Sequence, residues 1–121
     1  MNQSSIPYTI ELEAEVREWL ARLPPNHYER VEAHADNLAE NAETLVEPYS
    51  RHLGGKVREL RFRLDGQSVR ITYWLARRRR VILLTVFRKT RQCQRDEVNR
   101  AIHAQAACEA GHAAADTIWT R

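Results

Sequence analysis

Residues 57–89 decide the fold, and they read V-R-E-L-R-F-R-L-D-G-Q-S-V-R-I-T-Y-W-L-A-R-R-R-R-V-I-L-L-T-V-F-R-K. The first two runs alternate apolar and polar side chains, as a β-strand with one buried face does. Asp65-Gly66 between them predicts a hairpin, because Gly accepts the positive φ that tight turns need. The third run, residues 81–87, is almost wholly apolar, which is typical of a central strand covered on both faces. The stretch therefore predicts a three-stranded antiparallel meander.

The first two strands are predicted to have one apolar face and one face that carries arginine. The apolar face holds Leu60, Phe62, Leu64, Val69, Ile71, Tyr73 and Leu75. The other face holds Glu59, Arg61, Arg63, Arg70, Thr72 and Trp74. Four adjacent arginines, residues 77–80, occupy the turn before the third strand, either as a tip that contacts phosphate or as a solvated turn.

The charge of the chain is unevenly distributed. Its formal net charge is +3 over 121 residues, but residues 1–50 carry −7 and residues 51–100 carry +11. A basic half opposite an acidic half indicates a polyanionic partner on one side. The alternative is that the outward arginines only keep the strands soluble and protect the edge of the sheet.

The segments before the meander predict one strand and two helices. Residues 8–12 are β-prone and fit an edge strand, and residues 13–23 carry an apolar stripe at helical spacing. Pro24-Pro25 ends that helix and begins a second, to about Leu45. Apolar residues recur in the second helix at steps of three and four, which predicts a helical hairpin laid over the apolar sheet face. The same seam fits a partner helix, and residues 47–55 read as a loop into the sheet.

The segments after the meander predict one further helix and a tail. The helix runs from about Gln94 to Ala110, with Asp96 and Glu97 in its first turn and Gly111 as a stop. Residues 111–121 form an alanine-rich tail that only Ile118 and Trp119 could anchor. The whole chain has the length of one domain.

Cysteine usage and hydropathy predict a cytoplasmic protein. Cys93 and Cys108 fit neither a metal site nor a disulfide framework, and the expectation is two reduced thiols. The first residues lack a signal-peptide pattern, and no apolar stretch reaches the length that spans a membrane. No membrane association and no metal are expected.

Several short stretches, in order, are similar to a known family. They are L-P-P at 23–25, Y-S-R-H-L-G-G-K-V-R-E-L-R-F at 49–62, R-I-T-Y at 70–73, V-I-L-L at 81–84, F-R-K-T at 87–90 and D-E-V-N-R-A at 96–101. The chain resembles the RelE/ParE toxin superfamily, in its HigB-like branch of small phage-derived proteins, over about residues 8–105. The resemblance implies an α+β fold with two N-terminal helices on a curved antiparallel sheet, made of a short N-terminal strand and the meander, and a C-terminal helix.

The resemblance also implies a function. Such a protein is the toxin of a type II toxin–antitoxin pair, which cuts mRNA in the ribosomal decoding site without metal or cofactor. Its expected partners are a helix-turn-helix antitoxin and the ribosome with its mRNA. The oligomeric state is left open, with a toxin–antitoxin heterotetramer as one alternative. Two alternatives keep the fold: a ParE-like poison of DNA gyrase, and a non-catalytic protein that binds only an antitoxin or nucleic acid.

Candidate site residues follow from the matched positions and from the chemistry of RNA cleavage by its own 2′-hydroxyl. Arg61 and Arg70 match basic strand residues implicated in cleavage, and a guanidinium fork suits a phosphate. Glu59 is a candidate base or a salt-bridge partner of the arginines, and Lys89 is a candidate acid. The expected RNA contacts are Arg63, Trp74, Arg78, Arg79, Arg88 and Arg91.

Some candidates keep a structural alternative. Trp74 either stacks on a base or is covered by the last helix. Tyr73 falls on the apolar side by alternation, and His52 fits a surface or structural histidine. The chain departs from many members of the family by carrying Thr85 where they carry histidine in the last strand, and Gln92-Cys93-Gln94 where they carry Lys-Thr-Pro.

Overall fold

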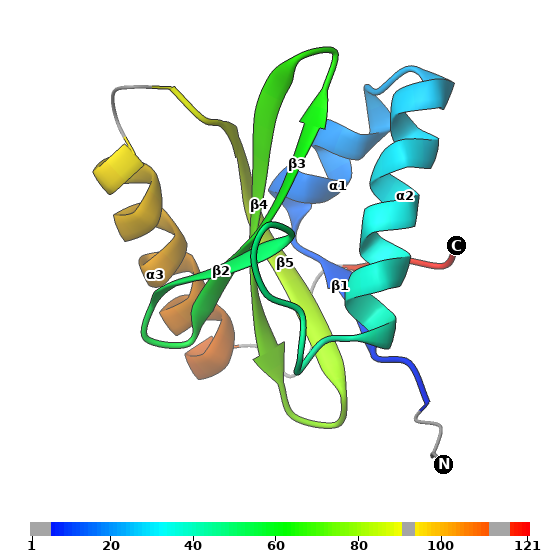
Figure 1. Ribbon diagram of the computed structural model, residues 1–121. Coiled ribbons are helices and arrows are strands. Elements are labelled where there is room, and N and C mark those ends of the chain that lie inside the picture. The colour runs from blue at the N-terminus through cyan, green and yellow to red at the C-terminus, as the bar shows by residue number, and fades with distance from the viewer. Residues whose placement is uncertain (1–5, 91–93, 112–116) are drawn as a thin grey trace.

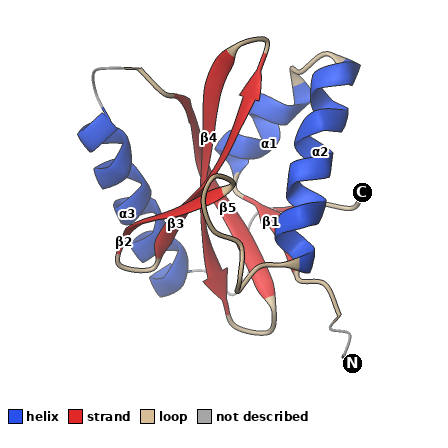
Figure 2. Ribbon diagram, viewed as in Figure 1, coloured by secondary structure: helices blue, strands red, loops and turns tan. Residues whose placement is uncertain are grey.

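The computed structural model describes residues 6–90, 94–111 and 117–121, and it has three layers. A six-stranded sheet in the order β2-β3-β4-β5-β1-β6 lies between helices α1 and α2 on one face and α3 on the other (Figures 1 and 2). The helices are α1 (Ala14–Ala21), α2 (Pro25–Glu40) and α3 (Gln94–Gly111). The strands are β1 (Thr9–Leu12), β2 (Ser50–Gly54), β3 (Val57–Leu64), β4 (Gln67–Ala76), β5 (Arg80–Arg88) and β6 (Thr117–Ile118). The predicted α+β fold with its two N-terminal helices, meander and C-terminal helix is confirmed.

The meander β3–β4–β5 has the predicted alternation. Asp65 and Gly66 form its first turn, with φ of 49° and 78°, and Leu64 pairs with Gln67 on either side of it. A two-residue turn with both central residues at positive φ matches the twist of a hairpin and fixes its register. The predicted apolar face packs under α1 and α2 in the main core, which contains Leu60, Phe62, Leu64, Val69, Ile71 and Tyr73.

Strand β1 is placed differently from the prediction. The sequence predicts an edge strand of an antiparallel sheet, but β1 lies parallel to β5, with Ile10 opposite Val81. Ile10 and Leu12 are buried in the main core, and the strand that carries them has a neighbouring strand at each edge. The short strand β6 covers its other edge. On the face of the sheet that α3 covers, the buried carboxylate of Glu11 forms an ion pair with Arg80, at 3.2 Å.

Strand β2 corrects the prediction for residues 47–55. Residues 50–54 form a strand antiparallel to β3, where the sequence predicts a loop. Its residues S-R-H-L-G lack an apolar alternation because β2 is the outermost strand, with Arg51 and His52 exposed. An edge strand of this kind leaves little local pattern to read.

The helices differ from the prediction at their ends. Helix α2 stops at Glu40 rather than near Leu45, although Leu45 is still buried in the main core. Helix α3 buries Ala101, Gln105 and Cys108, while Ile102 is 37% exposed. Together with Trp74, Ile82 and Leu84, α3 forms a second, smaller core on the opposite face of the sheet. None of the described helices combines the length and the apolar character needed to cross a membrane.

Candidate functional site

The site is centred on Glu59, which two arginines flank. The register of β3 and β4 places Arg61 directly opposite Arg70, and Glu59 lies on the same face two residues before Arg61. One carboxylate oxygen, Oε2, lies 3.6 Å from Nε of Arg61 and 3.4 Å from Nε of Arg70. The two arginines, which the sequence predicts on one face of the sheet, therefore both form an ion pair with Glu59.

Burial determines the electrostatics of this cluster. The side chain of Glu59 is 1% exposed, that of Arg70 is 6% exposed and that of Arg61 is 20% exposed. Burial raises the pKa of Glu59, and the charges of Arg70 and Arg61 oppose that rise. Burial also lowers the pKa of Arg70, which Glu59 counteracts. When two opposite charges are removed from water, the cost of losing their hydration cancels part of the energy gained from their attraction.

The polar atoms of the cluster are incompletely satisfied. Oε1 of Glu59 and Nε of both Arg61 and Arg70 are buried and have no hydrogen-bond partner among the described residues. The contacts are thus ion pairs without aligned hydrogen bonds. Buried groups with free bonding capacity are uncommon in folded proteins and often mark functional sites.

More cations surround this centre. Arg51 lies opposite Glu59 on β2, and its charge and that of Lys89 act on Glu59. Arg63 continues the row on β3 and is restrained by bonds to the carbonyl oxygen of Gly66 (2.5 Å) and to Oγ of Ser68 (3.3 Å). The sequence does not single out Arg51, because the pattern of residues 47–55 predicts a loop. Its position two residues after Tyr49, in the stretch shared with the family, was the available signal.

A groove beside the cluster opens along the edge of β3. Its volume is about 440 Å³. It is lined by Arg30 and His34 from α2, by Glu47, Pro48 and Tyr49 from the loop before β2, and by Arg61, Phe62, Arg63, Ser68 and Arg70 from β3 and β4. Glu47 reaches Arg61 from this side, at 3.7 Å. The groove gives Arg61 and Arg70 an approach from solvent.

Three predicted RNA contacts lie away from the cluster. Arg88 lines a separate cavity of about 370 Å³ with Trp19, Leu23 and His27, on the face that α1 and α2 cover. Arg78 and Arg79 form the β4–β5 turn at the end of the sheet opposite the β3–β4 hairpin (Figure 1). Arg79 lies over the ring of Tyr8 at 4.4 Å. The structure therefore corrects the grouping of these arginines with Arg61 and Arg70.

The structure decides between the alternatives for the aromatic candidates. Trp74 is 8% exposed and packs against Cys108 under α3, which contradicts its predicted role in base stacking. Tyr73 is fully buried and shares a 2.6 Å hydrogen bond with Ser50, as its core assignment predicts. His52 bonds to the carbonyl oxygen of Gly55 at 2.8 Å, in keeping with a structural role. Arg91 lies outside the described residues.

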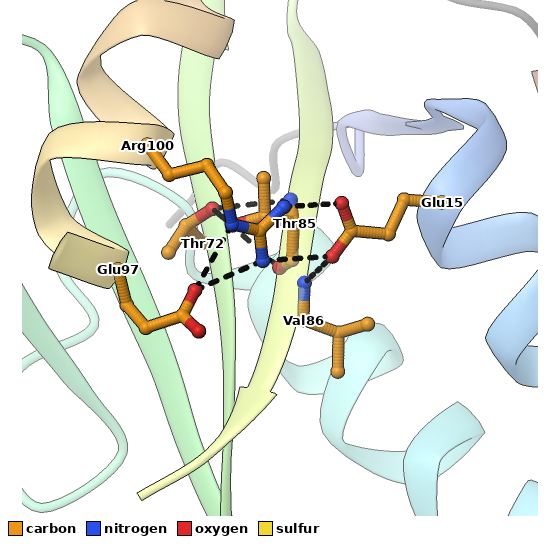
Figure 3. A network of polar contacts seen from close by, with 6 residues as sticks. All are labelled: Glu15, Thr72, Thr85, Val86, Glu97 and Arg100. Carbon is orange, nitrogen blue, oxygen red and sulfur yellow. Dashed lines mark hydrogen bonds and ion pairs between the residues drawn. The ribbon is translucent and has the colours of Figure 1, made fainter. Parts of the chain in front are cut away.

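Thr85 is the last-strand residue at which the family resemblance leads one to expect histidine. Its hydroxyl is 2.5 Å from that of Thr72 across the β4–β5 pair, and both residues are buried (Figure 3). Near this pair, Arg100 of α3 binds Glu97 and Glu15. A buried threonine pair cannot supply a proton at neutral pH as a histidine can. No group of three potential metal ligands occurs in the part of the chain that the structure describes.

A family model decides where the chain belongs. The model of the family "Phage derived protein Gp49-like (DUF891)" matches residues 18–106, which include the whole meander and most of α3. The chain belongs to this Gp49-like family. The match includes Glu59, Arg61 and Arg70 and leaves out β1 and the C-terminal segment. A search of curated protein sequences found no significant match.

Solved structures identify the fold of this Gp49-like protein. A mutant of the E. coli toxin RelE in the free state superposes with a TM-score of 0.59 at 14% identity, over 81% of this chain and 97% of that one. The toxin–antitoxin complex RelBE2 of Mycobacterium tuberculosis contains a chain with a TM-score of 0.52 at 23% identity, over 69% of this chain and 100% of that one. The family model thus confirms the predicted phage-derived family, and the two solved structures confirm the predicted RelE-type fold.

Proposed function

We propose that this protein is the toxin of a toxin–antitoxin pair and cuts mRNA bound to the ribosome. The observation that carries the proposal is the Arg61–Glu59–Arg70 cluster beside a solvent-open groove, on the most basic part of the chain. The RelE fold and the Gp49-like family support it. A helix-turn-helix antitoxin and the ribosome are the proposed partners.

The proposed chemistry is internal transfer of a phosphoryl group. The 2′-oxygen attacks the adjacent phosphorus, the bond to the 5′-oxygen breaks, and the products are a 2′,3′-cyclic phosphate and a 5′-hydroxyl. Arg61 and Arg70 stabilise the charge that gathers on the phosphoryl oxygens, because guanidinium forks are preorganised for that geometry. The 2′-hydroxyl gives its proton to solvent water in the groove. Lys89 is the proposed donor of a proton to the 5′-oxygen, and it regains a proton from solvent.

Glu59 is proposed to position the arginines. Its carboxylate is 1% exposed and already faces both guanidinium groups. It therefore orients the two arginines toward the groove and does not contact the substrate itself. Arg51 and Arg63 contact neighbouring phosphates at the rim. In this arrangement Arg51 and Arg63, which are exposed, bind the RNA backbone, while Arg61 and Arg70 lie beneath the reacting phosphate.

The first prediction tests this assignment. Primer extension on ribosome-bound mRNA should show cleavage by the wild-type protein and a loss of at least about 100-fold in the Arg61→Ala/Arg70→Ala variant, as removal of preorganised charge stabilisation does elsewhere. Arg88→Ala is the matched control, because that arginine lies on the other face of the sheet. It should cleave at the wild-type rate.

Other outcomes identify other functions. Undiminished cleavage by a folded double-arginine variant would refute the assignment of the site. Inhibition of DNA gyrase in a supercoiling assay, without any cut in mRNA, would favour a gyrase poison with the same fold. If expression of the wild-type protein without its antitoxin leaves growth unchanged, a non-catalytic binding protein is favoured.

A further inference from the structure

The groove beside Arg61 is formed by an edge of β3 that no strand covers. Strand β2 pairs with β3 only as far as Ser50 opposite Leu60, and among the described residues no strand continues this pairing. Helix α2 lies on one side of the open edge, where Arg30 bonds to the carbonyl oxygen of Arg63 at 3.1 Å. The loop that carries Tyr49 lies on the other side. Both sheet faces therefore contribute side chains to one groove.

Aromatic rings line this groove. His34 stacks on Phe62, with ring centroids 4.8 Å apart and an angle of 17° between the planes. Tyr49 is 47% exposed, although large aromatic side chains are mostly buried in proteins. Its backbone is fixed at both polar atoms, since its nitrogen bonds to the carbonyl oxygen of Val46 (3.0 Å) and its oxygen accepts from the nitrogen of Arg61 (2.8 Å). The main chain that carries this exposed ring is thus held beside the cluster.

Cations share the lining of this groove with the rings. Arg30 comes from α2, Arg61 and Arg63 from β3, and Arg70 from β4. Arg30 and Arg63 are both restrained by the bonds described above, so their charges stay in place. Burial and the charge of Arg30 lower the pKa of His34, which favours its uncharged ring. Flat rings and restrained arginines in one groove match the two parts of a nucleotide, a base to stack and a phosphate to neutralise.

We propose that this groove is a subsite for one unpaired RNA base, which stacks on Tyr49 while its phosphate lies against Arg61. The inference rests on the proposed function and adds to it a base-recognising residue outside the cleaving cluster. A cavity of about 440 Å³ is in the size range of small-ligand sites, roughly 300–1,000 Å³. Stacking accepts any base, so Tyr49 gives affinity and position rather than a strict sequence code.

The test compares nucleotides with their base-free equivalent. Nucleoside 3′-monophosphates and ribose phosphate are titrated into the full-length protein, and binding is followed by NMR chemical shifts. The wild-type protein should bind the nucleotides roughly 5- to 100-fold more tightly than ribose phosphate, the gain that one stacked base provides. Tyr49→Ala should remove this gain and Tyr49→Phe should keep it.

A matched control separates the groove from the general surface. Tyr8→Ala removes another partly exposed tyrosine, which lies beside Arg79 at the far turn, and should leave nucleotide binding unchanged. Equal affinity for nucleotides and ribose phosphate in the wild-type protein would overturn the proposal. So would a full base-dependent gain in Tyr49→Ala.

Ribosome assays separate this proposal from the proposed function. If the wild-type protein cuts mRNA but Tyr49→Ala retains the same cleavage rate, the same cut positions and the same nucleotide affinity, the subsite is refuted and the nuclease stands. If Tyr49→Ala loses the base-dependent affinity but the wild-type protein cuts no mRNA, the nuclease is refuted and the subsite stands.

Discussion

Glu59 shows at the level of one residue how a site can be at odds with stability. Its carboxylate is buried, and burial raises its pKa even though Arg70 and Arg61 are close enough to oppose the rise. The ionised form is therefore less favoured in the folded protein than in the unfolded chain. A residue kept under such conditions is better explained by its effect on the neighbouring arginines than by a contribution to folding.

This argument predicts an unusual pH dependence for Glu59→Gln. A carboxyl group whose pKa is raised by folding stabilises the folded state below its unfolded pKa, about 4.3, and that stabilisation is lost as the pH rises through the folded value. The amide variant should therefore gain stability relative to the wild-type protein as the pH rises from acidic to neutral. It should nevertheless lose most of its mRNA cleavage, because the arginines lose the charge that orients them.

Urea unfolding at several pH values measures the difference directly. The free energy of unfolding of Glu59→Gln relative to the wild-type protein should rise between acidic and neutral pH. A variant that becomes progressively less stable than the wild-type protein over that range would show that the ion pairs, and not burial, dominate. Cleavage unaffected by the substitution would remove Glu59 from the positioning role.

At the level of elements, an ion-pair bridge joins two helices on opposite faces of the sheet. Strand β1 pairs with β5 only as far as Leu83, and beyond it Glu15 of α1 accepts a hydrogen bond from the backbone nitrogen of Val86 at 3.0 Å. Arg100 of α3 binds both oxygens of the same carboxylate, at 2.5 and 3.0 Å, and also Glu97 (Figure 3). The bridge passes around the edge of β5 and raises the pKa of Arg100 through the bond to Glu15.

A double-mutant cycle on Arg100→Ala and Glu15→Gln should detect this bridge. We expect a coupling energy of about 0.5–1 kcal/mol. Both side chains are more than a third exposed, so solvent screens the pair, while its bidentate geometry favours the upper end of this range. Urea unfolding of the four proteins gives the value, and added salt should reduce it. Strictly additive single effects would mean that α3 is held by its apolar contacts alone.

At the level of the whole molecule, the C-terminal segment closes the sheet. Trp119 is 6% exposed and belongs to the main core. Its backbone nitrogen bonds to the carbonyl oxygen of Ile10 at 2.8 Å, and its indole nitrogen bonds to the hydroxyl of Tyr28 at 2.9 Å. Arg121 adds an ion pair with Asp36 of α2. Trp119 thus ties this segment to β1 through its backbone and to α2 through its side chain.

Trp119→Ala should consequently destabilise the protein by about 3 kcal/mol, the usual cost of removing a buried tryptophan. Ile118→Ala is the matched control, because its side chain is 60% exposed and its loss should change stability by less than about 0.5 kcal/mol. Thermal or urea unfolding measures both. The tryptophan variant should also self-associate more, as its β1 edge loses cover, and equal stability of the two variants would refute the anchoring role.

Local pattern in the sequence was sufficient for the meander and for the central arginine pair. The period-two alternation of β3 and β4 is a property of neighbouring residues, and the two-residue turn at Asp65-Gly66 sets the register that places Arg61 opposite Arg70. The family resemblance added the α+β fold with two N-terminal helices on the sheet and a C-terminal helix. Each of these features depends on short-range geometry that the chain itself specifies.

Only the tertiary structure decided what surrounds those residues. The strand character of residues 50–54, and with it the place of Arg51, depends on pairing with β3, because a polar edge strand has no pattern of its own. The cover over Trp74, the burial of Glu59 and the turning of Arg88 to the opposite face arise from helices and strands distant in sequence. Burial and the charges around a group set its pKa and its access to solvent, and these are properties of the packed molecule rather than of any stretch of sequence.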